Sequence, residues 1–488
     1  MCANILSAAL LLSAGGAYGY VRYREGQLKT QLAPHIVAAG PAPKGSGGLP
    51  PMNILLIGNN TRTGLKPSEA SFFGSPAQVG GARSDVTMVL HLDPVRNTAS
   101  LLSIPRDLFV SLPPHSLAGP YGKVDAGLDG QSSNPAATGP DNLIQTIEDD
   151  LGIPINHFIS INFDGFQQTI NDIGGIKMSF ATQLYDKDAG LNITKTGCQL
   201  LNGAQALAVV RSRHLQYMQN GRWLNDPESD LARIVRDHIF LRVFVDTARA
   251  KLHSIFAANA LIGGLLQQVT VDPGLTPQLL LELYKHYRTL NVNTVPETTL
   301  PITTVTNYHY AGGTYGDVDM PVEPLDHQVI DKWAGAPLPS SPPPAVSVRV
   351  VNRSGSYQAG AAMASGLAGL GYHVTGPAYG TPLATVSETV LHYHPGSAAN
   401  ALGVLHNLAG AVMLHADPSV AAGTVVVDVG TAVSVNIPAP AAQGGSAAAT
   451  APATSQATPT TPTTLVTIGN QNPSPAADHV PFYDPKAC

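Results

Sequence analysis

The chain has 488 residues, which is enough for about three domains of ordinary size. Only 12% of the residues are charged and the formal net charge is −6, so the overall charge gives no basis for nucleic-acid binding, and an anionic ligand would have to be held by a local cluster of basic side chains. Cys2, Cys198 and Cys488 are the only cysteines, and because no two of them are close in sequence a zinc site is not expected.

The first predicted element is an apolar segment at residues 3–21, ANILSAALLLSAGGAYGYV, which is about long enough for one transmembrane helix. A cleaved signal peptide is the alternative, because the segment ends in small residues. Arg22, Arg24 and Lys29 follow the segment and no basic residue precedes it, which by itself argues against export of the rest. A true start site upstream, in a basic stretch, would remove this conflict. We expect a single-pass membrane anchor within residues 1–32 and the remaining chain outside the cytoplasm.

After a Pro/Gly-rich linker at residues 33–52, strand-like and helix-like patterns alternate up to about residue 335. We expect strands, in chain order, at residues 53–58, 86–92, 98–104, 157–162 and 176–180. We expect helices at residues 139–152, 163–175, 201–213 and 229–251, with further helical pieces between 253 and 335. This alternation predicts a layered α/β domain over residues 53–335, in which helices flank a sheet.

A second break, at residues 336–344, is proline-rich and should be an extended spacer. Residues 345–433 then show strand, helix and strand patterns, which predict a smaller α/β domain. Residues 434–488 are rich in Ala, Pro, Thr and Ser and cannot bury enough apolar surface to fold, so we expect a disordered tail. In an exported protein Cys198 and Cys488 could form one disulfide, although two free thiols fit the sequence equally well.

Charged residues collect at one end of a predicted hairpin. The turn DPVRN joins the second and third predicted strands, so the paired residue numbers should add up to about 190. Asp85 then faces Pro105, which cannot donate a ladder hydrogen bond and should end the regular pairing. Arg83, Asp85 and Arg106 would therefore meet at a rim of the sheet, where catalytic residues are common. A simple cross-strand ion pair between Asp85 and Arg106 is the alternative interpretation.

Two later segments supply further basic residues. Arg211 and Arg213 follow an apolar helical run, and residues two positions apart share a face only where the chain is extended. Arg233, Arg236 and Asp237 fall within about a 100° arc of the long helix. The alternative for this helix is a solvated face with an Arg233–Asp237 ion pair.

Together these motifs resemble the LytR-CpsA-Psr family, extracellular bacterial enzymes that attach glycopolymers to peptidoglycan. The similar motifs cover residues 53–251 and are, in order, NILLIG, ARSD, SIPRD, GKVDAG, GIPINHFISINFDGF, INDIGGI, LNGAQALAVVRSRH and SDLARIVRDHIFLR. Residues 345–433 look like the C-terminal companion domain often appended to these proteins.

The resemblance implies transfer of a glycan phosphate from a polyprenyl pyrophosphate carrier to a peptidoglycan hydroxyl, with Mg²⁺ assisting. It implies that Asp85 is the catalytic or metal-binding carboxylate, with Arg83 and Arg106 beside it. Guanidinium groups can bind two oxygens of a diphosphate at once and stabilise charge on the leaving phosphate. The basic residues that the resemblance assigns to the pyrophosphate are Arg62, Arg83, Arg106, Lys123, Arg211, Arg213, Arg233 and Arg236.

Two positions depart from the family's pattern. Asn60 stands where an aspartate is usual, and its amide carbonyl could coordinate Mg²⁺ only without charge. Asp237 stands where a glutamine is usual, and it either neutralises an arginine or replaces the lost carboxylate. The predicted metal ligands are therefore Asp85, Asn60 and Asp237.

These observations favour a membrane-anchored phosphotransferase that forms a phosphodiester during cell-wall assembly, with lipid-linked glycan and peptidoglycan as partners. A non-catalytic protein that binds polyprenyl phosphate or cell-wall glycan is the alternative. A signalling or transcription-regulating protein is disfavoured by the N-terminal segment and by the lack of a basic patch. Arabinogalactan, teichoic acid and capsule all remain compatible as the transferred glycopolymer.

Overall fold

The computed structural model describes residues 29–61, 81–114, 116–130, 139–227, 230–251, 264, 267–379, 388–435 and 480–488. The expected membrane anchor and Arg62 lie outside these residues. Among the helices of the described part, none combines the length and the apolar character that a membrane span needs.

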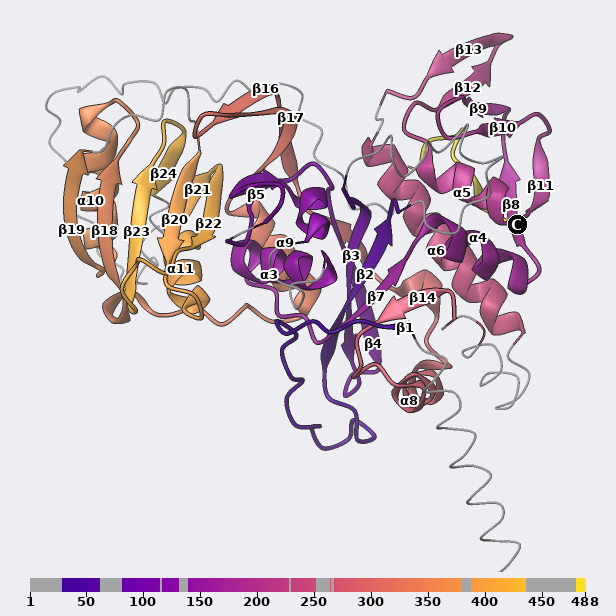
Figure 1. Ribbon diagram of the computed structural model, residues 1–488, viewed down its shortest axis with the longest axis horizontal. Coiled ribbons are helices and arrows are strands. Elements are labelled where there is room, and N and C mark those ends of the chain that lie inside the picture. Colours follow the sequence, from indigo (N-terminus) through magenta and orange to yellow (C-terminus); the bar gives the residue numbers. More distant parts are fainter. Residues whose placement is uncertain are drawn as a thin grey trace, which may run out of the picture.

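A mixed seven-stranded sheet forms the centre of the larger domain (Figure 1). Its strands, in spatial order, are β1 (Lys29–Thr30), β14 (Val269–Val271), β7 (His157–Ile161), β2 (Met52–Asn59), β3 (Ser84–Asp93), β4 (Thr98–Ile104) and β15 (Glu297–Thr299). β2 runs parallel to β7, whereas β2, β3 and β4 form an antiparallel meander. Both faces of the sheet are covered, which explains why β2 is a continuous apolar run in which Ile54, Leu55 and Ile57 are all buried.

The predicted hairpin is confirmed as β3 and β4, with its register one position later than expected. Leu92 pairs with Ala99, and the last regular pair, Thr87 with Ile104, comes directly before Pro105. The loss of the proline N–H therefore ends the ladder as predicted. Asp85 and Arg106 emerge together at this rim.

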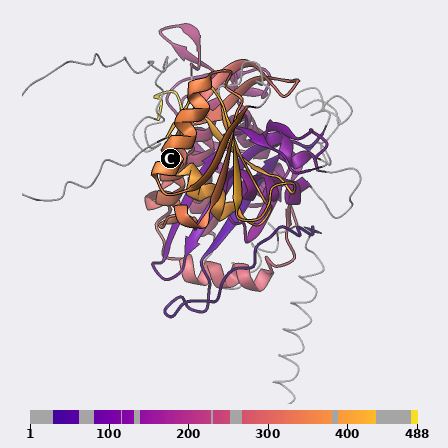
Figure 2. The same ribbon diagram turned by 90° about the vertical axis from the view of Figure 1, so that its left-hand side faces the viewer.

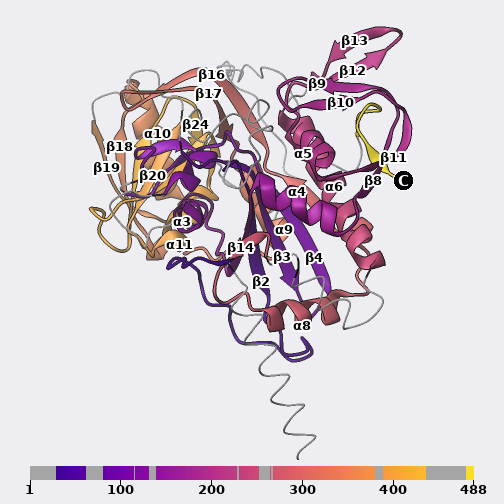
Figure 3. The same cartoon turned by 45° about the vertical axis from the view of Figure 1, so that its right-hand side comes forward.

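Helices lie on both faces of the central sheet (Figures 1 and 3). One face carries α4 (Phe163–Asp172), α5 (Gly203–Arg211), α6 (Asp230–Ala250) and α8 (Pro277–Tyr287). The other face packs against α3 (Gly139–Leu151) and α9 (Leu325–Ala334) in a core that contains Leu55, Leu143 and Ile330. The predicted layered α/β fold is thus confirmed, although residues 253–335 also contain strands that the sequence analysis did not predict.

Short strands extend the larger domain on both sides of the central sheet. Next to α3 is β5 (Phe109–Ser111), which pairs with β6 (Tyr121–Lys123). The hairpin of β16 (Ile302–Tyr310) and β17 (Gly313–Pro321) packs against β5 and β6 through β17. Beyond α4 and α5 are β8 (Ile176–Phe180), β9 (Leu184–Asp186), β10 (Leu191–Ile193), β11 (Gly197–Leu201), β12 (Gln216–Gln219) and β13 (Arg222–Asn225).

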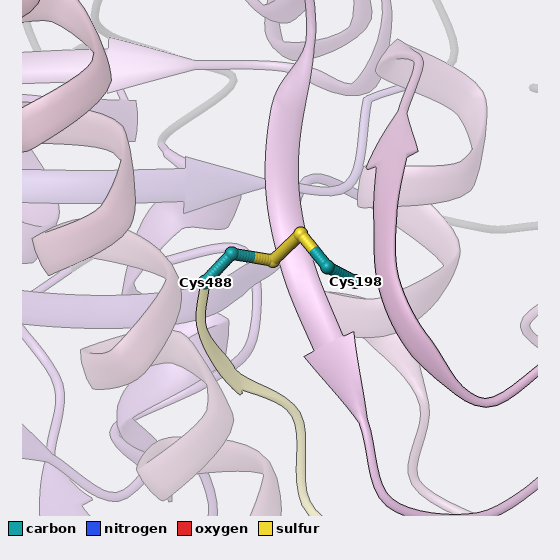
Figure 4. Close-up of a disulfide and its surroundings, with 2 residues drawn as sticks. All are labelled: Cys198 and Cys488. Atoms are coloured by element: carbon teal, nitrogen blue, oxygen red, sulfur yellow. A yellow bond between two sulfur atoms is a disulfide. The ribbon is translucent and has the colours of Figure 1, made fainter.

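The segment Val480–Cys488 folds onto the larger domain, so the prediction of a disordered tail is wrong for these residues. Its strand β25 (Lys486–Ala487) pairs antiparallel with β8. Cys198, on β11, forms a disulfide with Cys488, with the two Cα atoms 5.8 Å apart (Figure 4). Of the two alternatives for these cysteines, the structure therefore has the disulfide. The low-complexity composition concealed a terminal segment, VPFYDPKAC, in which Tyr483 is buried.

The smaller C-terminal domain has a five-stranded sheet and two helices. The strands, in spatial order, are β19 (His373–Tyr379), β18 (Ser347–Asn352), β23 (Thr424–Val429), β20 (Thr389–Tyr393) and β22 (Val412–Ala416), and the helices are α10 (Tyr357–Gly369) and α11 (Ala398–Leu405). β21 (Leu408–Gly410) pairs with β24 (Val433–Val435), so ordered structure continues two residues past the expected end. Figure 2 views the molecule from the side of this domain, whose core is continuous with that around α3.

Candidate functional site

A cavity of about 680 Å³ lies between the central sheet and the helices α4, α5, α6 and α8. Most of its wall is apolar: the sheet contributes Leu56, Met88 and Ile159, and the helices contribute Phe166 and Phe240. An apolar pocket with a few converging polar groups is the usual form of a small-ligand site.

Charged and amide side chains line the same cavity and come from neighbouring strand ends and helix ends. They are Asn59, Asn60, Asp85, Arg106, Asn162, Arg211, Arg213, Arg233 and Asp237. The topology brings them together, because β2 and β4 end where β3 begins, and β7 ends on the same side as β2. The cavity therefore has an apolar body and a polar end rich in arginine.

Arg106 is at the centre of the ion pairs at this polar end. One Nη atom lies 2.5 Å from Oδ1 of Asp85, and the other lies 2.7 Å from Oδ2 of Asp125. Oδ1 of Asp125 also lies 4.0 Å from Nη1 of Arg83. Burial raises the pKa of Asp125 by more than Arg106 and Arg83 lower it. The expected ion pair between Asp85 and Arg106 is present, but as part of a larger cluster rather than an isolated pair.

Asp107 holds a second set of basic side chains. Its carboxylate lies 2.9 Å from Nζ of Lys123, 3.5 Å from Arg213 and 3.6 Å from Nε of Arg106. Burial alone would raise the pKa of Asp107, but these three cations together lower it. Asp107 therefore orients Arg106, Lys123 and Arg213 together.

The remaining arginines of the cavity are held by other contacts. The guanidinium of Arg211 lies over the ring of Phe163, 4.5 Å from its centroid. Arg233 and Asp237 approach to 4.0 Å and are only 3% and 7% exposed, so the solvated helix face considered for them is wrong. Both of these side chains face the cavity.

One predicted pyrophosphate ligand, Arg236, lies away from the cavity. Arg236 is fully buried and does not line the cavity, because it donates to Asp226, Asp484 and the carbonyl of Ser212. A 100° arc of a helix is wide enough for its two edges to meet different neighbours. Arg83 and Lys123 adjoin the polar end through their carboxylate partners without lining the cavity, and Arg62 lies outside the described residues.

The predicted magnesium ligands Asp85, Asn60 and Asp237 all line the same cavity. Asp85 and Asp237 both line the polar end, and Mg²⁺ is usually held by one or two carboxylates together with substrate phosphates and water. The side-chain carbonyl of Asn60 already accepts the backbone N–H of Arg83 at 3.0 Å. The two carboxylates are therefore ligands of the type that Mg²⁺ uses, whereas the carbonyl of Asn60 holds the backbone of Arg83.

Sequence reasoning missed Asp125 as a site residue. It lies within the GKVDAG motif from which only Lys123 was selected, and it is 4% exposed. The signal that could have identified Asp125 is its place in the same motif as Lys123, a predicted basic ligand.

The model of the LytR_cpsA_psr family matches residues 43–321, more than half of the chain. The chain belongs to the LytR-CpsA-Psr family. A second family model, described as LytR cell envelope-related transcriptional attenuator, matches residues 345–432.

Among curated relatives of this LytR-CpsA-Psr protein is the probable cell wall biosynthesis protein LcpB of Corynebacterium glutamicum, which is 32% identical over 224 residues, or 46% of this chain and 48% of the relative. The chain thus spans about half of that relative's length. The polyisoprenyl-teichoic acid–peptidoglycan teichoic acid transferase TagT of Bacillus subtilis is 27% identical over 55% of this chain and 75% of the relative. Among solved structures, a LytR-Csp2A-Psr enzyme from Actinomyces oris covers 63% of this chain and 96% of its own, with 18% identity and a TM-score of 0.44.

Proposed function

We propose that this protein moves a glycopolymer phosphate from a polyprenyl pyrophosphate carrier to a hydroxyl of peptidoglycan and thereby forms a phosphodiester. The observation that carries the proposal is one cavity whose apolar body ends in the cluster of Asp85, Arg106, Arg211, Arg213 and Arg233. A polyprenyl chain suits the apolar body, and a pyrophosphate suits the arginines. The transferase names of several relatives support the same reaction class.

The residues at the polar end can perform the transfer by binding and proton movement. The acceptor oxygen forms a bond to the phosphorus that carries the glycan, the bond from that phosphorus to the bridging oxygen breaks, and polyprenyl phosphate leaves. Asp85 accepts the proton of the acceptor hydroxyl. Arg106, Arg211 and Arg213 hold the phosphate oxygens and stabilise the charge that develops on the leaving phosphate.

Magnesium is the cofactor that we propose for this site. Asp85 and Asp237 would hold the ion, which would supply additional positive charge to the diphosphate oxygens. We further propose that the N-terminal apolar segment anchors the protein in the membrane with both domains outside the cytoplasm, where lipid-linked glycan and peptidoglycan meet.

The reaction can be tested with the purified chain, lipid-linked glycan, peptidoglycan and Mg²⁺, by measuring released polyprenyl phosphate. We expect release from the wild type, loss on chelation of Mg²⁺, and a drop of at least about a hundredfold in Asp85→Ala, the range typical of a lost general base. Asp246→Ala, which removes an exposed carboxylate of α6, is the matched control and should retain activity. Lipid binding without any turnover would instead support the non-catalytic binding protein.

A further inference from the structure

The backbone between Arg211 and Arg213 is held from two sides by buried charged groups. Arg236 donates to the carbonyl of Ser212 at 2.7 Å. From the other side, Oδ2 of Asp186 accepts the hydroxyl of Ser212 at 2.7 Å and the backbone N–H groups of Arg213 and His214 at 3.1 and 3.0 Å. The residue that links the two cavity-lining arginines is therefore fixed by its carbonyl and by its hydroxyl.

Arg236 is itself fixed by two carboxylates. Its Nη1 atom lies 3.1 Å from Asp226 and 3.0 Å from Asp484, and the side chains of Arg236 and Asp484 are both 0% exposed. A guanidinium group in the protein interior is tolerated only when it is paired and hydrogen-bonded. Asp484 therefore helps to determine where Arg236 places its Nη2 atom.

Asp484 belongs to the segment Val480–Cys488. Contacts that come before and after Asp484 in the chain attach this segment to the larger domain. Before Asp484, Tyr483 stacks on Tyr217 with ring centroids 4.0 Å apart and donates to Asp226 at 3.0 Å. After it, β25 pairs with β8 and the disulfide to Cys198 closes the segment (Figure 4). An aspartate held in this way has a fixed position relative to Arg236.

We propose that the segment Val480–Cys488 is a positioning element of the binding site: Asp484 fixes Arg236, and Arg236 fixes Ser212 so that Arg211 and Arg213 point into the cavity. This inference rests on the proposed function, because it assigns these arginines to a pyrophosphate group. Asp484 touches no substrate in this scheme and acts only through Arg236.

The test compares Asp484→Asn with the wild type in the full chain, using geranylgeranyl pyrophosphate and the uncharged geranylgeraniol as probes in calorimetric titrations. We expect the Kd for the pyrophosphate to rise at least about tenfold, the effect of weakening one charge-assisted hydrogen-bond network. The Kd for geranylgeraniol should stay unchanged, because the apolar body of the cavity is untouched. Lys486→Ala, an exposed change in the same segment, is the control and should leave both values as they are.

Hydrogen exchange at the amides of Arg213 and His214 provides a second readout that needs no ligand. Exchange should become faster in Asp484→Asn, and also in the triple variant Arg236→Met/Asp226→Asn/Asp484→Leu, which removes the buried charges together if the single variant does not fold. Unchanged exchange and unchanged pyrophosphate affinity in a folded variant would overturn the inference. A wild type that binds no pyrophosphate, with exchange that still responds to Asp484, would overturn the proposed function and leave the positioning role standing.

Discussion

Arg106 contacts three carboxylates of different burial, those of Asp85, Asp107 and Asp125. Each contact constrains a different part of the site. Through Asp85 it fixes the proposed proton acceptor, and through Asp125 it anchors the GKVDAG motif. The side chain itself is 16% exposed, so one edge of the guanidinium can still meet a ligand in the cavity.

Arg106→Lys should separate charge from geometry. Lysine keeps the positive charge but cannot contact Asp85 and Asp125 at once with a planar fork. We expect kcat to fall by roughly a hundredfold or more, as when a donor to the transition state is removed. The melting temperature should change by only a few degrees, as measured by calorimetry. A normal kcat in a folded Arg106→Lys protein would contradict the role given to the fork.

At the residue scale, the sequence predicted contacts that depend on local geometry. It did not predict contacts that depend on a partner far away in the chain. The meeting of Asp85 and Arg106 follows from a turn and a register, which are local properties. Arg236 was misplaced because its partner Asp484 is 248 positions away in the chain. No periodicity within the helix could reveal that contact.

Among the secondary-structure elements, α3 ends in three consecutive acidic residues next to the smaller domain. Glu148 accepts the backbone N–H of Ile155 at 3.0 Å, and Tyr393 of the smaller domain donates to the carbonyl of Asp149 at 2.8 Å. Burial is the main cause that raises the pKa of Glu148 to about 7 and that of Asp149 to about 6. The negative end of the helix dipole also lies here, which disfavours the charged forms.

These raised pKa values predict that stability falls as the pH rises. The protonated carboxyls are favoured in the folded protein, so their contribution is complete below the unfolded pKa of about 4 and is lost as the pH rises through about 6 to 7. Urea unfolding at pH 5, 6, 7 and 8 should show a free energy of unfolding that decreases as the pH rises. In Glu148→Gln the total decrease over this range should be smaller by at most about 3 kcal/mol. Glu282→Gln, on the exposed side of α8, is the control, and an unchanged decrease in Glu148→Gln would show that Glu148 is not the group responsible.

The elements of the larger domain were predictable to different degrees for physical reasons. β2, β3 and β4 are long apolar runs bounded by turn residues, and their sequences therefore indicate strands directly. The hairpin of β16 and β17 was missed because most of β16 is polar and at least partly exposed, which removes the hydrophobic signal of a strand. Its aromatic residues Tyr308 and Tyr310 are buried against Phe109 instead.

On the scale of the whole molecule, the Cys198–Cys488 disulfide connects parts of the chain 290 positions apart. Cys488→Ser, or reduction of the wild type, should lower the free energy of unfolding by about 2–4 kcal/mol, because the unfolded chain regains the freedom that the bridge removes. Chemical denaturation with and without reductant measures this change. Cys2→Ser keeps the bridge and is the control; a bridge-free variant as stable as that control would contradict the expectation.

The same bridge closes residues 198–488 into a covalent ring that contains α6, α9 and the entire smaller domain. A protease that cuts this ring once releases nothing, because both fragments stay joined through sulfur. The cut protein would run as one band on a denaturing gel without reductant and as two bands with it. Shedding of the smaller domain would therefore take two cuts, or one cut and a reducing environment.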